Sequence, residues 1–76
     1  MSKTELLIVQ KACFCIRQFN KFLKDKNLRM AALEESSAES LIKIIETFNL
    51  DLANELFKTL RNFANYEYTA FWDNFF

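Results

Sequence analysis

Cys13 and Cys15 are the most reactive side chains in this chain of 76 residues. They stand two positions apart in a segment whose pattern predicts a helix, so they would project about 200° apart on it. They can therefore neither bridge each other nor bind one zinc ion together. Because the chain has no histidine and no other cysteine, a four-ligand zinc site is excluded. We expect free thiols, buried as small hydrophobic groups in a reducing compartment; the alternatives are an intermolecular disulfide and a redox sensor.

The sequence lacks residues on which many enzymes depend for catalysis or for phosphate binding. Without histidine, the common general base near neutral pH is missing. Without glycine, a phosphate-cradling loop of the Walker or dinucleotide type cannot form. Carboxylate pairs such as Glu34 and Glu35 are adjacent, and adjacent residues diverge on a helix. We predict that the protein is not an enzyme and takes no cofactor, no metal and no small-molecule substrate.

Aromatic residues crowd the C-terminal segment. Six of them fall within eleven positions: Tyr66, Tyr68, Phe71, Trp72, Phe75 and Phe76. One interpretation is that they fold back and cap the core, since aromatic rings bury large apolar areas. The other is that they anchor a second protein or a second copy, because aromatic side chains dominate interface hot spots. We single out Tyr68, Phe71, Trp72 and Phe75 as partner-binding residues. A membrane role is not expected, because this segment has no Lys or Arg for anionic lipid.

Charge is distributed unevenly, although the formal net charge is zero. Residues 1–30 carry a net charge of +5 and residues 31–76 carry −5. One predicted solvent-facing stripe of the first helix contains Lys3, Gln10, Arg17, Lys21 and Lys24. The basic helix could lie against acidic helices, within the fold or across a dimer; alternatively, it could face nucleic acid. We expect no exposed aromatic residue in this stripe, as stacking on single strands would require. Arg17, Lys21 and Lys24 are the predicted polar contacts to a partner.

Helices alone are expected to position these side chains. Apolar residues recur at spacings of three and four, and predict helices over residues 3–25, 28–35, 37–48 and 50–74. Because Gly and Pro are absent, we expect Asn27, Asn49 and Asn65 to supply the left-handed residues that end helices. Capping boxes are predicted at Ser2, with Glu5, and at Ser36, with Glu39. Two alternatives stay open: a single helix over 28–48, and a last helix that bends at Asn65.

Asn20 occupies a position of the first predicted helix at which the apolar spacing predicts a hydrophobic residue. The register that it interrupts is Leu6, Val9, Cys13, Ile16 and Leu23. A buried Asn at such a position can fix the register of a helical dimer. The alternative is that this face turns outward before Asn20.

The energetics favour a dimer. Burying about 5,000 Å² of apolar surface at about 25 cal/mol per Å² would supply about 120 kcal/mol. Ordering the chain at about 1.5 kcal/mol per residue costs about 115 kcal/mol. Because the two terms nearly cancel, covering more apolar surface with a second copy or a partner would stabilise the fold.

The sequence thus predicts one all-α domain, a compact bundle of three to four helices that forms a homodimer. The function it favours is protein binding, as an adaptor, regulator or inhibitor that occupies a partner's surface. The alternative is a small nucleic-acid-binding regulator that uses the basic face of the first helix. We place the protein in the cytoplasm, since the apolar runs are too short for a signal peptide or a membrane span.

Overall fold

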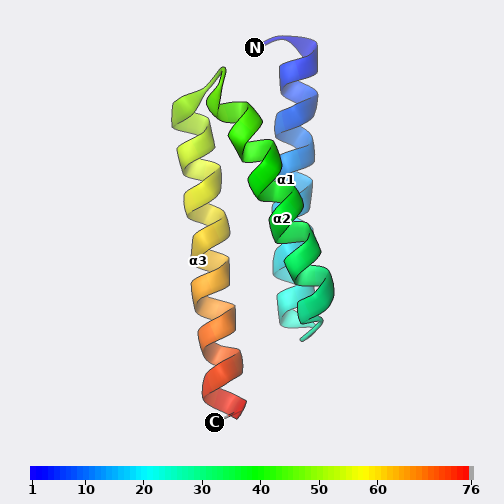
Figure 1. Ribbon diagram of the computed structural model, residues 1–76, viewed down its shortest axis with the longest axis vertical. Helices are drawn as coiled ribbons and strands as arrows, with labels where there is room; N and C mark the ends of the chain where they lie inside the picture. Colours follow the sequence, from blue (N-terminus) through cyan, green and yellow to red (C-terminus); the bar gives the residue numbers. More distant parts are fainter. Residues whose placement is uncertain (76) are drawn as a thin grey trace.

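The computed structural model describes the backbone of residues 1–75 and the side chains of residues 1–63. It is an all-α bundle of three helices, α1 (Lys3–Lys24), α2 (Leu28–Glu46) and α3 (Leu50–Phe75). Each helix runs antiparallel to the one before it, and both connections are short (Figure 1). The bundle thus has three helices, within the predicted range of three to four.

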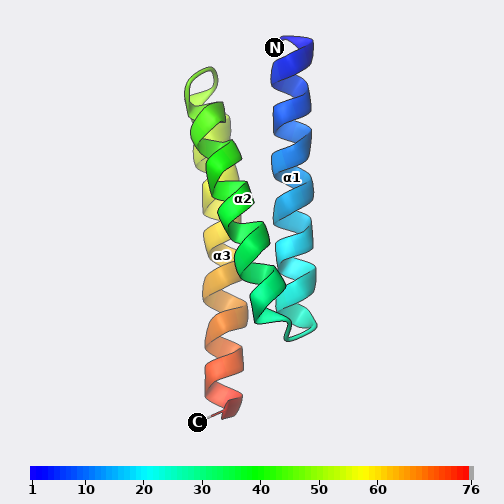
Figure 2. The same cartoon turned by 45° about the vertical axis from the view of Figure 1, so that its right-hand side comes forward.

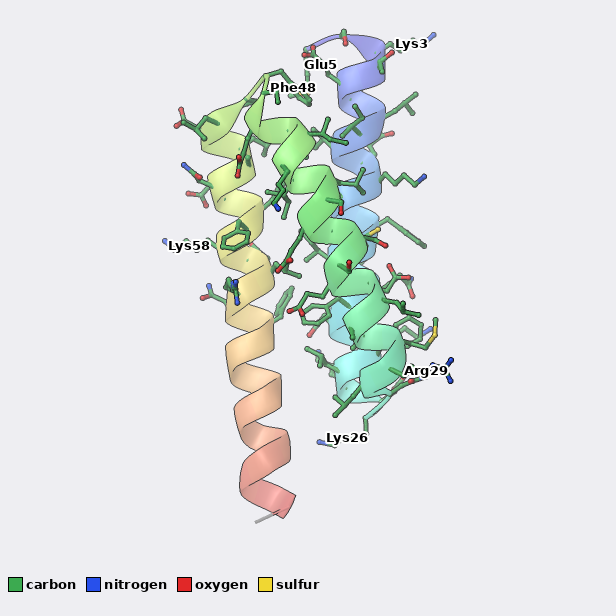
Figure 3. All side chains as sticks on the ribbon, viewed as in Figure 1. Lys3, Glu5, Lys26, Arg29, Phe48 and Lys58 are labelled. Atoms are coloured by element: carbon green, nitrogen blue, oxygen red, sulfur yellow. The ribbon has the colours of Figure 1, made fainter. Side chains whose placement is uncertain are left out.

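The capping box predicted at the start of α1 is confirmed. The Ser2 Oγ accepts from the Glu5 N–H at 3.1 Å, and the Glu5 carboxylate accepts from the Ser2 N–H at 2.7 Å. The bond from the Ser2 backbone, followed by that from its side chain, holds the pKa of Glu5 below its ordinary value. Glu5 lies at the N-terminal end of α1 (Figure 3), where a carboxylate also suits the helix dipole.

The two connections use asparagine differently from the prediction. Lys26, with φ 61°, takes the left-handed conformation that we expected at Asn27. Asn27 begins α2 instead, its side chain accepting from the Met30 N–H at 3.3 Å. Asn49 likewise accepts from the Leu52 N–H at 3.1 Å at the start of α3. These asparagines start helices because their short carbonyl side chain satisfies a free N–H of the first turn.

The predicted break between residues 35 and 37 is wrong. A single helix, α2, spans Leu28–Glu46 where two helices over residues 28–35 and 37–48 were predicted. Ser36 and Ser37 are exposed within it, and the Ser40 hydroxyl donates to the Ser36 carbonyl at 3.1 Å. Mid-helix serines are tolerated when they face solvent or bond back to the preceding turn. The last helix continues through Asn65 without ending there.

The core is concentrated between α1 and α2, which make the most extensive helix–helix contact. Its buried members are Ala12, Cys15, Ile16, Phe19, Leu23, Ala31, Ala38, Ile42, Ile45, Ala53 and Leu60. Three alanines in α1 and α2 are among them, and small side chains let helix axes approach closely. At the α2–α3 connection, Phe48 packs against this core (Figure 3).

The bundle is elongated. Its Cα atoms extend over 46 × 19 × 13 Å, and the radius of gyration is 13.2 Å, against about 11 Å for a compact chain of this length. Its accessible surface is 5357 Å², while a compact monomer of this mass exposes about 4,900 Å². The C-terminal turns of α3, orange to red, extend beyond the α1–α2 connection (Figures 1 and 2).

No helix in the described part of the chain is both long enough and apolar enough to cross a membrane.

Candidate functional site

The solvent side of α1 combines cations with large apolar side chains. We call it the outer face of α1, and its exposed members are Lys3, Leu7, Gln10, Phe14, Arg17, Lys21 and Lys24. Phe14 is 56% exposed and Leu7 is 61% exposed. Because residues three and seven positions apart share a helix face, Phe14 lies alongside Arg17 and Lys21. The outer face is therefore a mixed basic and aromatic surface.

Our expectation that this stripe lacks an exposed aromatic residue is wrong. The buried face of α1 is centred on Ala12, Ile16 and Phe19. Phe14, two residues after Ala12, falls on the other side of the helix. Leu7 precedes Phe14 by seven residues and falls on the same side. The sequence signal for this exposed pair is that Leu7 and Phe14 stand seven positions apart within a stripe of Lys and Gln.

Arg17, Lys21 and Lys24, three cations of the outer face, are not neutralised by any side chain that the structure describes. Arg17, Lys21 and Lys24 are all exposed, and within the described part none of them makes a side-chain ion pair. Pairing of the basic helix with acidic helices inside the fold is thus not observed for these three predicted contact residues. Their charge is available to a partner.

A groove of about 520 Å³ runs between α1 and α2, next to the outer face. We call it the α1–α2 groove, and its lining residues are Lys11, Phe14, Cys15, Glu34, Ser36, Ser37, Ser40 and Leu41. Two further exposed residues of α2, Leu33 and Ile44, lie on the same helix face as Ser37 and Ser40. Small hydroxyl side chains thus form the floor of a recess that is flanked by large hydrophobic ones.

The two cysteines are free and face different neighbours, as their spacing predicted. Cys15 is buried beside α2, in the wall of the α1–α2 groove, whereas Cys13 is half-buried and lines a groove shared with α3. Burial, followed by the nearby Glu34 carboxylate, raises the pKa of the Cys15 thiol. A raised pKa keeps this thiol neutral and makes it a poor nucleophile.

The groove between α1 and α3 is smaller, about 240 Å³, and is lined by Cys13, Ile16, Arg17, Leu56, Thr59 and Phe63. Asn20 follows Cys13 and Ile16 in register. Its Oδ1 is buried and has no hydrogen-bond partner in the described part of the chain. The alternative that this face turns outward before Asn20 is therefore wrong, since Leu23, one turn further, is also buried.

The opposite side of the bundle, between α2 and α3, has a different chemistry. A groove of about 230 Å³ is lined there by Glu39, Ile42, Lys43, Glu46, Phe57 and Arg61. The Arg61 guanidinium lies over the Phe57 ring, 5.0 Å from its centroid. Burial, followed by repulsion from Glu39, raises the pKa of Glu35, although Arg61 opposes this.

Residues 1–63 contain no cluster of three His, Cys, Asp or Glu side chains that could hold a metal ion.

The predicted aromatic contact residues lie on the C-terminal turns of α3. The backbone is helical there, so the spacing of Tyr68, Phe71, Trp72 and Phe75 places them on one helix face. Their side chains lie outside the described residues. The structure thus separates the two predicted sets: the aromatic residues belong to α3, and Arg17, Lys21 and Lys24 belong to α1.

Comparisons with known proteins give no relative for this chain. No family model matches the sequence, and neither a curated protein nor a solved structure matches it.

Proposed function

We propose that this chain is a small protein-binding module that acts as an adaptor, regulator or inhibitor by occupying a partner's surface. One observation carries the proposal: Phe14 is 56% exposed beside cations that have no ion-pair partner among residues 1–63. Aromatic and arginine side chains are the residues that contribute most to interface affinity. A contiguous apolar patch bordered by polar residues is typical of interaction sites on small proteins.

The surface indicates the chemistry of the partner. Leu7 and Phe14 would bury apolar side chains of the partner, and Arg17, Lys21 and Lys24 would pair with its carboxylates. The partner is therefore a protein surface that combines acidic residues with projecting hydrophobic ones. The C-terminal turns of α3, where Tyr68, Phe71, Trp72 and Phe75 share a helix face, offer a second contact region beyond the α1–α2 connection (Figure 2).

Nucleic-acid binding is the second candidate, and the exposure of Phe14 favours it too. An aromatic ring among Lys11, Arg17 and Lys21 could stack on a base while the cations contact phosphates. We rank it second because Leu33 and Ile44, exposed at 57% and 46% on the α2 face that carries Ser37 and Ser40, would gain little from a phosphate backbone. Hydrophobic side chains in such numbers suit a protein partner better.

Site-specific photo-cross-linking tests the protein-binding proposal. A benzophenone amino acid replaces Phe14 in cells that express the protein, and the matched control carries it at Asn54, an exposed position of α3. We expect discrete protein adducts from position 14 that disappear in the variant Arg17→Glu/Lys21→Glu. Adducts of the same pattern and yield from positions 14 and 54 would contradict a specific surface.

Fluorescence-anisotropy titrations against duplex and single-stranded oligonucleotides at low salt separate the two candidates. If the outer face binds protein, the titrations stay flat. Binding that weakens steeply with salt and is abolished by Arg17→Glu/Lys21→Glu would instead establish the nucleic-acid function.

A further inference from the structure

We propose that the α1–α2 groove and the adjoining outer face of α1 receive the C-terminal turns of α3 from a second copy of this chain. This inference rests on the proposed function and names the partner of the same surface. It joins two features of the fold: a helix end that extends beyond its own bundle, and an exposed recess on the side of the bundle.

The C-terminal turns of α3 are placed where they can contact a second chain. α3 continues as a helix to Phe75, and its C-terminal turns extend past the α1–α2 connection (Figures 1 and 2). They are too far along the bundle axis to lie against the α1–α2 groove of their own chain. A second copy can offer its groove to them.

Charge favours this pairing. Residues 62–76 contain Glu67 and Asp73 and neither Lys nor Arg, which gives them a net charge of −2. α1 carries five cations and one carboxylate, a net charge of +4. Its cations Lys11, Arg17 and Lys21 are exposed on or beside the groove, whereas α2 contributes one carboxylate, Glu34, to the groove lining. An acidic, aromatic helix end thus meets a surface whose α1 side is basic, which favours both encounter and register.

The groove also has the shape for a helix. Ser36, Ser37 and Ser40 are exposed and small, so a second helix can approach α2 closely there. Phe14 and Leu41 stand on either side of the recess, where they can contact the rings of an incoming helix. Packing of large side chains into a gap left by small ones is how helices interlock.

The buried area is sufficient for a stable dimer. Aromatic side chains bury about 150–250 Å² each, so four of them give about 600 Å² per helix end at the lower value. A two-fold arrangement docks both helix ends reciprocally and closes the assembly. The two helix ends then bury about 1,200 Å², and the grooves add a similar area, which exceeds the lower limit of about 1,200 Å² for stable interfaces.

Direct pairing of the two helix ends with each other is the competing arrangement. It would bring two segments of net charge −2 together, and like charges across an interface are unfavourable. It would also leave Leu33, Ile44 and Phe14 exposed. The observations therefore favour the groove.

Sedimentation velocity on full-length variants tests the inference. The groove variant is Phe14→Glu/Ser37→Glu, and the helix-end variant is Phe71→Gln/Trp72→Gln. The control, Asn54→Glu/Asn62→Glu, adds the same two charges at exposed positions of α3. We expect dimers for the natural chain and the control, and monomers for each of the other two. An equimolar mixture of the two monomeric variants should regain a dimer, because one intact helix end can enter one intact groove.

Three results would overturn the inference: a monomeric natural chain, a groove variant that stays dimeric, or a mixture that forms no heterodimer far above the dimerisation midpoint of the natural chain. Circular dichroism confirms that each variant is folded; if the double groove variant is not, Ser37→Glu alone replaces it. A monomeric chain that still gives protein adducts from position 14 would refute this inference and leave the proposed function standing. A chain without any adduct from position 14 would refute the proposed function itself.

Discussion

α1 and α2 together contribute more buried side chains to the core than the described part of α3 does. α1 and α2 together contribute nine of the buried core residues, Phe19, Ile42 and Ile45 among them, whereas the described part of α3 contributes Ala53 and Leu60. Leu52, Leu56 and Phe63 of α3 are half-buried against that core. Among the described side chains, the α1–α2 pair therefore supplies most of the buried core, and α3 supplies a smaller part of it.

This difference accounts for where function can reside. The inner face of α1 packs in the core, while its outer face keeps Phe14 and Leu7 exposed beside cations that are unpaired within the described side chains. α3 is committed over its N-terminal part and extends past the bundle with its C-terminal turns (Figure 1). Both regions carry large apolar residues, Leu7 and Phe14 on α1 and Tyr68, Phe71, Trp72 and Phe75 in the C-terminal turns of α3. We propose that both contact a partner.

Truncating Phe19 should produce the largest effect. Phe19 is the largest of the fully buried side chains, so Phe19→Ala should lower the free energy of unfolding by about 3–5 kcal/mol. Leu56→Ala, at a half-buried position of α3, should cost less than about 2 kcal/mol, since less surface returns to water. Urea denaturation followed by circular dichroism measures both. Equal losses would break the distinction between the α1–α2 core and α3.

Enlarging a small residue between α1 and α2 should come next. Ala38 is fully buried, and Ala38→Leu should cost about 1–3 kcal/mol by overpacking. Ala32→Leu, on the exposed side of the same helix, is the matched control and should change stability by less than about 0.5 kcal/mol. If both variants unfold at the same denaturant concentration, close packing of α1 on α2 is not what holds the pair together.

Replacing Asn20 should stabilise the contact between α1 and α3. Its buried Oδ1 has no partner in the described part of the chain, and a buried unpaired carbonyl is unfavourable by about 1–3 kcal/mol. Asn20→Leu should therefore raise the free energy of unfolding by about 1 kcal/mol, which a thermal melt detects as a higher Tm. A lower Tm would mean that Asn20 contributes a polar interaction that a leucine cannot replace.

The smallest effect concerns Glu35 and depends on pH. Burial raises the pKa of Glu35 in the folded state, so folding is penalised above that pKa, where the carboxylate is charged, and the penalty disappears as the pH falls through it. Glu35→Gln should thus be more stable than the natural chain at neutral pH, and the two should converge in acid. Urea midpoints at both pH values measure this; an advantage that persists unchanged in acid would contradict the sign.

Much of the fold was predictable because helix signals are local. The capping box at Ser2 and the apolar residues at spacings of three and four, Ile16 and Leu23 among them, identified α1. The break at Ser36 was wrong because the same capping motif fits inside a helix once packing of Ala31 and Ala38 keeps the chain helical. Local sequence does not report that tertiary contribution.

The candidate site was predictable only in part, for a related reason. The basic stripe with Arg17, Lys21 and Lys24 followed from periodicity, and all three are exposed. Phe14 was not predicted as a surface residue, although its position relative to Ala12 places it on the outer side of α1. Ile44 fits the helical spacing of a buried stripe, yet it is 46% exposed, because the orientation of α2 depends on its packing against both neighbouring helices.

Light scattering on the intact protein at several concentrations shows whether contact with another chain covers the apolar surface that the bundle leaves exposed. We expect a particle of twice the 9.0 kDa chain mass that dissociates on dilution. A 9.0 kDa particle at every concentration, together with no binding of an apolar dye to its surface, would contradict it.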